Sequence, residues 1–270
     1  MTDPLTSWLQ RGAGHQGPVA LMYHSVRRGS GRPDWPWAVS RARLRDQLDA
    51  LRDHGWHTVT VAELAGTAPL PARAVAITFD DGYVDNLDAV EDLAERGQRA
   101  SWFIVSGSIG RMPAWSDPGR PDGRLLSAAE LRDMTAAGMC IGSHTVTHPR
   151  LTELADADLE RELSGSRDML QQAVGDAVDT LAYPYGLWDE RCVAAARAAG
   201  YRAAITTRTG WALRDGDALR IRRLTVFNED TTASVLRKVA LATNDAGTGR
   251  LLGRMLRQLG RRILPAGSAA

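Results

Sequence analysis

Short apolar runs that alternate with amphipathic segments constrain the fold of this chain more than any other feature. The apolar runs lie at residues 19–26, 74–79, 99–106, 139–144, 179–184, 201–207 and 219–226. Helical segments separate or follow them at about 40–55, 86–97, 127–138, 152–175, 189–199 and 231–242. Strands that are apolar throughout are typical of a parallel sheet covered by helices. Seven or eight such units favour an α/β barrel over an open sheet.

Local signals support two of these helices. Ser40 is expected to cap the start of one helix, and Gly55 to follow its end. Ser127 and Glu130 have the spacing of a capping box, and Gly138 closes that segment. These signals place helix boundaries without reference to the rest of the fold.

The length of 270 residues suits one large domain or two small ones, and no second domain is evident. We expect an extension at 1–18, one main domain at 19–245 and an appended tail at 246–270. The formal net charge is +1, and the sequence contains no known nucleic-acid-binding motif, so a nucleic-acid partner is not expected. No signal core or membrane-length apolar stretch is present, so we expect a cytoplasmic chain unless a signal has been removed.

Polar side chains gather where the predicted strands end. Six of them stand at or just beyond these ends: His24, Asp80, Asp81, His144, His148 and Tyr185. The carboxyl ends of barrel strands share one rim, which is where catalytic residues of such barrels lie. We therefore expect these six residues, distant in sequence, to converge.

Two imidazoles and one carboxylate form a common ligand set for a catalytic divalent metal. Zn²⁺ is the first candidate, and Co²⁺, Ni²⁺, Mn²⁺ or Fe²⁺ would also suit these donors. Adjacent carboxylates at a strand end do not easily point at one ion. One of Asp80 and Asp81 is therefore expected to bind metal, while the other accepts a proton from water.

Each motif alone has a simpler structural explanation. FDDG and YPYG are ordinary turn sequences, SHTVTH could be a solvated loop, and His24 could be a structural histidine. Their joint placement at strand ends favours a functional site over these explanations.

The motifs TFDDG (78–82), SHTVTH (143–148) and AYPYG (182–186) resemble the successive motifs of the polysaccharide deacetylases, the NodB-homology or carbohydrate esterase family four enzymes. The resemblance runs from about residue 19 to 226. The opening LMYHSV points to the branch that includes the biofilm poly-N-acetylglucosamine deacetylases. It implies a single-domain distorted (β/α)7 barrel and metal-dependent hydrolysis of a sugar acetamide.

The resemblance also implies roles for individual residues. Asp80 matches the general base, and the metal ligands match Asp81, His144 and His148. Tyr185 matches the residue whose backbone N–H binds the oxyanion. The late histidine that serves as general acid in many members is missing, because no histidine follows His148. His24 is then the candidate acid.

A second departure concerns the arginine that orients the catalytic aspartate in many members, since Ala182 stands in its place. Arg222 or Arg223 could supply this cation, and strand alternation lets only one of them point inward. The alternative is that both are surface arginines. The family's Asp-x-x-Asp-Trp motif is absent as well, which leaves Trp211 as a weak candidate for a groove wall.

Two long Gly/Pro-rich segments follow predicted strands at 27–39 and 107–124. They carry Trp35, Trp37 and Trp115, which are expected either to wall a substrate groove or to pin the loops to the barrel.

The segment 249–267 has apolar residues at helical spacing with arginines between them. Such a helix could rest on an anionic membrane, contact a second subunit or pack on the barrel, and we favour packing.

Three functions are consistent with these observations. The first is a metal-dependent de-N-acetylase of an N-acetylhexosamine glycan or glycoconjugate. The second is a hydrolase of another linear amide, such as a formylated amino sugar or a small nitrogenous metabolite. The third is a catalytically silent carbohydrate-binding module, which the intact metal and base positions disfavour.

Overall fold

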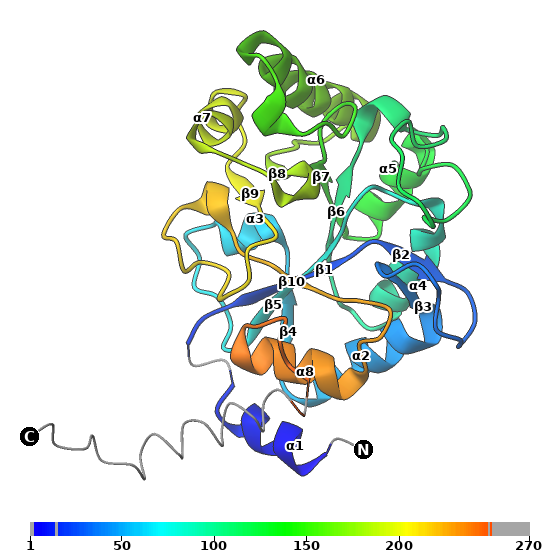
Figure 1. Cartoon of the computed structure of the whole chain (residues 1–270), viewed down its shortest axis with the longest axis vertical. Coiled ribbons are helices and arrows are strands. Elements are labelled where there is room, and N and C mark those ends of the chain that lie inside the picture. Colours follow the sequence, from blue (N-terminus) through cyan, green and yellow to red (C-terminus); the bar gives the residue numbers. More distant parts are fainter. Residues whose placement is uncertain (1–2, 14–15, 248, 250–270) are drawn as a thin grey trace, which may run out of the picture.

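The computed structural model describes residues 3–13, 16–247 and 249 of the chain. Within these residues the main sheet has eight strands, all paired in parallel, in the order β10-β1-β5-β6-β7-β8-β9 with β4 also paired to β5 (Figure 1). The strands are β1 (Val19–Tyr23), β4 (His57–Val59), β5 (Ala74–Phe79), β6 (Ser101–Ile104), β7 (Cys140–Ser143), β8 (Thr180–Ala182), β9 (Ala203–Ile205) and β10 (Leu224–Thr225). The predicted α/β class with a parallel sheet is confirmed.

The sheet curls into a distorted barrel. β1 pairs along β5 from Val75 to Phe79, while β4 and β6 divide the other edge of β5 between them. A single parallel bridge, Ile205 with Ile221, joins the end of β9 to the segment that leads into β10. The ring is therefore closed by very short elements. A separate two-stranded sheet, β2 (Ser25–Arg27) with β3 (Ala38–Ser40), lies over one side.

Helices surround the sheet. They are α1 (Pro4–Arg11), α2 (Arg41–Asp53), α3 (Val61–Leu64), α4 (Leu87–Glu95), α5 (Ala128–Ala136), α6 (Asp156–Val174), α7 (Glu190–Ala198) and α8 (Thr232–Leu241). Short 3₁₀ turns occur at η1 (Val84–Asn86), η2 (Ser106–Ser108), η3 (Leu151–Glu153), η4 (Pro184–Gly186) and η5 (Ala218–Arg220). Every residue of β1 and β5 is buried, which explains their continuous apolar sequences.

The predicted helix boundaries are confirmed by their capping contacts. The hydroxyl of Ser40 accepts from the backbone N–H of Arg43, and Gly55 follows the end of α2 with a φ of 74°. Ser127 and Glu130 form both hydrogen bonds of a capping box at the start of α5.

Four short elements were not expected from the sequence: α1, β3, β4 and α3. Three or four residues are too few to show a hydrophobic period, and α1 depends on contacts with distant segments. The side chain of Gln10 donates to the carbonyl of Leu236 in α8 and accepts from the indole N–H of Trp56. Helix α1 thus packs on α8.

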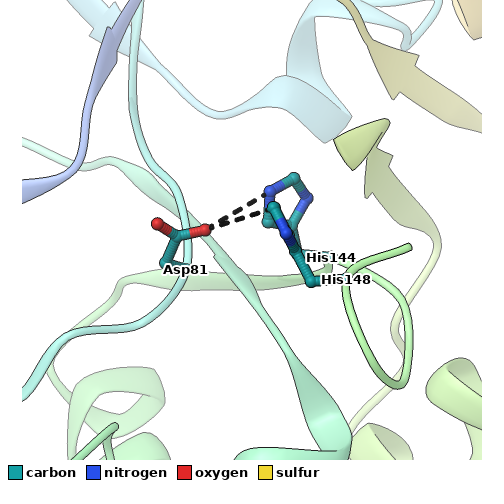
Figure 2. Close-up of side chains that lie close together, drawn as sticks. All are labelled: Asp81, His144 and His148. Carbon is teal, nitrogen blue, oxygen red and sulfur yellow. Dashed lines mark ion pairs between the residues drawn. The ribbon is translucent and has the colours of Figure 1, made fainter. Parts of the chain in front are cut away.

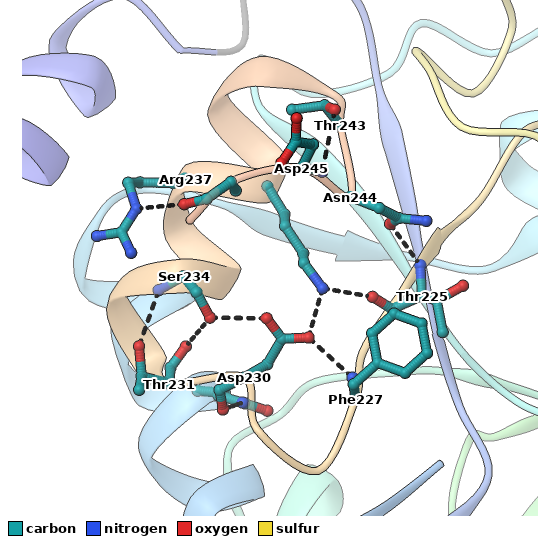
Figure 3. A network of polar contacts seen from close by, with 12 residues as sticks. Thr225, Phe227, Asp230, Thr231, Ser234, Arg237, Thr243, Asn244 and Asp245 are labelled. Carbon is teal, nitrogen blue, oxygen red and sulfur yellow. Dashed lines mark hydrogen bonds and ion pairs between the residues drawn. The ribbon is translucent and has the colours of Figure 1, made fainter. Parts of the chain in front are cut away.

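A buried polar network ties β10 to α8 (Figure 3). Lys238, the sole lysine of the chain, pairs with Asp230 and donates to the carbonyl of Thr225 at 2.7 Å. Asp230 also accepts from the backbone N–H of Phe227 and the hydroxyl of Ser234, both at 2.8 Å. The network anchors the strand that follows the two candidate arginines.

The predicted basic helix at 249–267 lies outside the described residues except for residue 249. Among the described helices, none combines the length and apolar character needed to cross a bilayer.

Candidate active site

One cavity of about 330 Å³ opens at the carboxyl ends of the strands. His24 directly follows β1, Asp80 and Asp81 follow β5, and His144 follows β7. Tyr185 lies in η4, just beyond β8. All six polar residues expected at the rim line this cavity, so the barrel brings them together.

Three of these side chains point at a common position (Figure 2). The Nε2 atoms of His144 and His148 each lie 3.6 Å from Oδ1 of Asp81. The three donor atoms lie within 4.8 Å of one another, and all three residues are buried. One carboxylate oxygen and two imidazole nitrogens in this arrangement match the donor chemistry of a divalent-metal site.

The protonation of the histidines also suits metal binding. Nδ1 of His144 lies 2.8 Å from the carbonyl oxygen of Ala182 and is therefore the protonated nitrogen, which leaves the lone pair of Nε2 facing Asp81. Burial lowers the pKa of His144, while burial and the neighbouring His144 lower the pKa of His148 to about 2. Neutral imidazole is the form that binds metal.

Asp81 is costly to keep ionised in the absence of a cation. Burial and the adjacent charge of Asp80 raise the pKa of Asp81 to about 8. A divalent cation among the three donors would remove this cost, because it favours the charged carboxylate. The residues present therefore fit a metal.

The backbone explains how adjacent aspartates serve different partners. Asp81 adopts the left-handed region with a φ of 71°, followed by Gly82 at 86°. The left-handed φ of Gly82 is the main reason that the turn favours glycine, and a Cβ there would also lie 2.9 Å from Cδ1 of Ile104. The turn directs Asp81 to the histidines and leaves Asp80 to another partner.

That partner is Arg223. Its guanidinium Nη1 lies 2.5 Å from Oδ1 of Asp80, and its side chain is only 1% exposed. Nη1 also donates to the hydroxyl of Thr78, and Nε donates to the carbonyl of Thr206. Burial alone would raise the pKa of Asp80, but the charge and hydrogen bond of Arg223, together with the neighbouring His144 and His24, outweigh burial and hold the pKa at about 2.

Arg222 lies on the other face of the same segment. It forms a two-pronged ion pair with Asp215 at 2.6 and 2.9 Å and makes no contact with Asp80. The sequence left two candidates for the cation beside Asp80, and the geometry places only Arg223 there.

His24 is half-buried beside the same cavity. Its Nδ1 meets no hydrogen-bond partner in the described part of the chain, and its ring packs edge-on against Trp35. Burial lowers the pKa of His24 to about 4, although the charge of Asp80 acts in the opposite direction. The imidazole is therefore neutral at pH 7.

Tyr185 has a left-handed backbone with a φ of 58° in the middle of η4. The centroid of its ring lies 4.6 Å from that of His148, and the guanidinium of Arg150 lies over the ring, 5.0 Å from its centroid. The side chain is 47% exposed, which leaves the ring at the mouth of the cavity.

The four tryptophans take different places. Trp37 and Trp115 line the cavity, and the Trp115 ring stacks on His148 at 4.8 Å. Trp35 is buried outside the cavity lining, packed against Tyr83. Trp211 also lies outside the lining, packed against the main hydrophobic core.

Two charged residues near the cavity were missed in the sequence. Asp117 lines it from the segment 107–124, and Arg150 covers Tyr185. Asp117 could have been predicted from its position in the segment 107–124, which follows a strand on the side of the barrel where the site lies. No spacing rule indicated Arg150.

Comparisons with known proteins indicate the family to which the chain belongs. The polysaccharide deacetylase family model matches residues 67–204, just over half of the chain. The Bacillus subtilis protein YxkH, which carries a polysaccharide deacetylase name, is 28% identical over 229 residues, covering 83% of this chain and 76% of YxkH. The poly-beta-1,6-N-acetyl-D-glucosamine N-deacetylase of Escherichia coli K12 is 30% identical over 145 residues, covering 52% of this chain and 20% of that enzyme.

Among solved structures, IcaB from Ammonifex degensii superposes with a TM-score of 0.69 at 28% identity. The match covers 84% of this chain and 97% of IcaB. With the family model over half its length and the matching fold, the chain belongs to the polysaccharide deacetylase family.

Proposed function

We propose that this protein is a metal-dependent hydrolase that removes the N-acetyl group from an N-acetylhexosamine unit of a glycan or glycoconjugate. The observation that carries the proposal is the Asp81–His144–His148 donor set beside the Asp80–Arg223 pair in one cavity. The E. coli relative's substrate supports the sugar, although this chain covers only a fifth of that enzyme.

Asp81 and the Nε2 atoms of His144 and His148 would hold the metal, with Zn²⁺ the first candidate and Co²⁺, Ni²⁺ or Mn²⁺ as alternatives. When bound, a divalent ion supplies Lewis acidity that polarises an amide carbonyl and makes water a better nucleophile near pH 7.

Asp80 is the proposed general base. Arg223 keeps the carboxylate ionised and occupies Oδ1, which leaves Oδ2 to accept a proton from the attacking water. The short contact also fixes the orientation of the carboxylate, since the guanidinium is itself held by Thr78 and Thr206.

The developing oxyanion needs a hydrogen-bond donor, and the backbone N–H of Tyr185 is the proposed one. The left-handed backbone at Tyr185 sets the direction of this group at the cavity mouth. His24 is the proposed acid for the departing amine. Because burial keeps it neutral, His24 must gain its proton during the reaction, and the proton that Asp80 takes from water is the proposed source. Its transfer restores the charge of Asp80, which favours protonated His24 until the proton passes to the amine.

Trp37 and Trp115 are the proposed walls for the sugar. Both line the cavity, and apolar ring faces suit the C–H faces of a pyranose. Trp35 and Trp211 lie outside this lining and are not included.

Acetate release from N-acetylglucosamine oligomers tests the proposal. Metal-stripped protein should be inactive, Zn²⁺ or Co²⁺ should restore release, and Asp80→Asn should lower the restored rate by about 10²–10⁴-fold, the usual contribution of a general base. Stoichiometric metal binding without acetate release would contradict the acetamide assignment, and a formylated amino sugar would then be the next substrate to assay. Failure to bind metal would refute the donor set.

A further inference from the structure

Glu162, in α6, contacts the loop that carries both histidines of the site. Its Oε2 accepts hydrogen bonds from the backbone N–H groups of Val146 and Thr147 at 2.8 and 2.9 Å. Its Oε1 accepts from the hydroxyl of Thr147 at 2.6 Å. One carboxylate thus binds two successive backbone amides and one side chain of the SHTVTH loop (residues 143–148).

This loop has an unfavourable backbone on both sides of these contacts. Thr145 has a φ of 70° and His148 a φ of 64°, and neither is glycine. Left-handed conformations of non-glycine residues are strained and persist only where surrounding contacts hold them. The position of the second histidine therefore depends on what fixes the loop.

The two histidines are oriented by different means. The ring of His144 is oriented by the hydrogen bond between Nδ1 and the carbonyl of Ala182. Nδ1 of His148 is buried and meets no hydrogen-bond partner among the described residues. Metal-binding histidines usually receive their orientation from such a bond, so His148 must receive it from its backbone and from the rings of Trp115 and Tyr185.

Other contacts hold the loop but leave the amides of Val146 and Thr147 to Glu162. Ser106 and Gly107 donate their backbone N–H groups to the carbonyls of Thr145 and Val146. One turn along α6 from Glu162, Ser166 binds the hydroxyl of Ser143 at the start of the loop. The carbonyls of Thr145 and Val146 are thus bound from one side, and the amides of Val146 and Thr147 from α6. The amides of Thr145 and His148 are bound within the loop, by the hydroxyls of Ser143 and Thr145.

We propose that Glu162 is a positioning residue for the metal site, which sets the conformation of the SHTVTH loop and through it the place of His148. The inference rests on the proposed metal-binding role of Asp81, His144 and His148. Glu162 reaches the ion only through the backbone of the loop, so its effect should appear in metal affinity before any substrate is added.

Titration of the metal-free full-length protein with Co²⁺ or Zn²⁺ against a chelator tests this inference. Loss of an outer-shell partner typically weakens metal binding 10- to 100-fold, so Glu162→Ala should raise the Kd by about that factor. Glu162→Gln keeps an oxygen that accepts from both amides and should recover most of the affinity. The visible spectrum of bound Co²⁺ should change in Glu162→Ala and remain close to wild type in Glu162→Gln.

Glu160→Ala is the matched control, because Glu160 is an exposed glutamate of the same helix. It removes the same charge and should leave the Kd unchanged. All Kd values are measured well below the unfolding temperature of each metal-free variant, so a loss of stability alone does not alter them.

A Kd for Glu162→Ala within about twofold of wild type would overturn the inference, while the metal site would stand. If Glu162→Ala does not fold, Glu162→Asp provides the test instead. The shorter aspartate cannot reach both backbone N–H groups and the Thr147 hydroxyl, so this variant should also raise the Kd for the metal. An unchanged Kd in Glu162→Asp would then overturn the inference. Wild-type protein that binds no metal would instead refute the proposed site itself.

Discussion

At the residue scale, the adjacent aspartates differ through their partners. Asp80 pairs with a buried arginine, whereas Asp81 faces two neutral imidazoles and its own charged neighbour. The same side chain therefore has its pKa held at about 2 in one case and raised to about 8 in the other. Asp80 stays ionised, which suits its proposed role as the general base. Asp81 is stabilised in its charged form by a cation, which suits its proposed role as a metal ligand.

Breaking the buried pair should be costly. Arg223→Met leaves Asp80 buried without its cation, and we expect the free energy of unfolding to fall by about 3–5 kcal/mol. Arg222→Met is the control one residue away. The Arg222–Asp215 pair keeps partial contact with solvent, with 14% and 19% of the two side chains exposed, so the expected loss is smaller, about 1–2 kcal/mol. Urea unfolding of the metal-free proteins at pH 7 measures both, and equal losses would contradict the distinct role given to Arg223.

At the element scale, helix ends are stabilised by local carboxylates. Glu130 accepts from the backbone N–H and hydroxyl of Ser127 and forms a two-pronged pair with Arg124 at 2.6 and 2.7 Å. The hydrogen bonds from Arg124 make the largest contribution to lowering the pKa of Glu130, and those from Ser127 add to it. Together they outweigh the effect of partial burial and lower this pKa to about 2. The start of α5 therefore depends on an ionised Glu130.

This arrangement predicts a pH-dependent contribution to stability. Because the folded-state pKa of Glu130 is lower than its unfolded value, its contribution is fully present above about pH 4.5 and is lost as the pH falls toward 2. Glu130→Gln should lower the free energy of unfolding by about 1–3 kcal/mol at pH 6 and by less at pH 3.5. Urea unfolding at the two pH values gives the comparison, and a difference that stays constant would show that the charge contributes nothing.

At the scale of the whole molecule, the candidate site links segments that are far apart in sequence. Asp81 follows β5, the histidines follow β7, and Arg223 precedes β10 at the point of closure. The Asp230–Lys238 network holds that last strand against α8 (Figure 3). A ligand that binds the assembled rim should therefore stabilise the entire fold.

Metal binding should raise the unfolding temperature, because the three donors meet only in the folded protein. At a free metal concentration of 100 times the Kd, the gain is about 2.7 kcal/mol. Thermal unfolding with Zn²⁺ and with a chelator measures it. In Asp81→Asn the metal-dependent increase should shrink or disappear, and an undiminished increase in that variant would place the metal elsewhere.

The sequence by itself determined the elements that depend on neighbouring residues. Apolar runs located β1 and β5 to β9, and capping residues located the starts of α2 and α5. The run 219–226 was wrong in extent, because it holds part of η5 and only the two-residue strand β10, and the run 19–26 divides into β1 and β2. The order and spacing of TFDDG, SHTVTH and AYPYG indicated the family and the donor set. These features were readable because hydrophobic period, helix capping and tight turns are local properties of the chain.

Only the tertiary structure decided which side chains share a space. It separated Arg223 from Arg222, placed Trp37 and Trp115 in the cavity without Trp35, and brought Glu162 to the SHTVTH loop. Strand register, barrel curvature and helix packing set these contacts, and each joins residues from different elements. A pattern along the chain reports the face on which a residue lies, but it does not report which distant residue lies opposite, because that depends on the packing of the whole barrel.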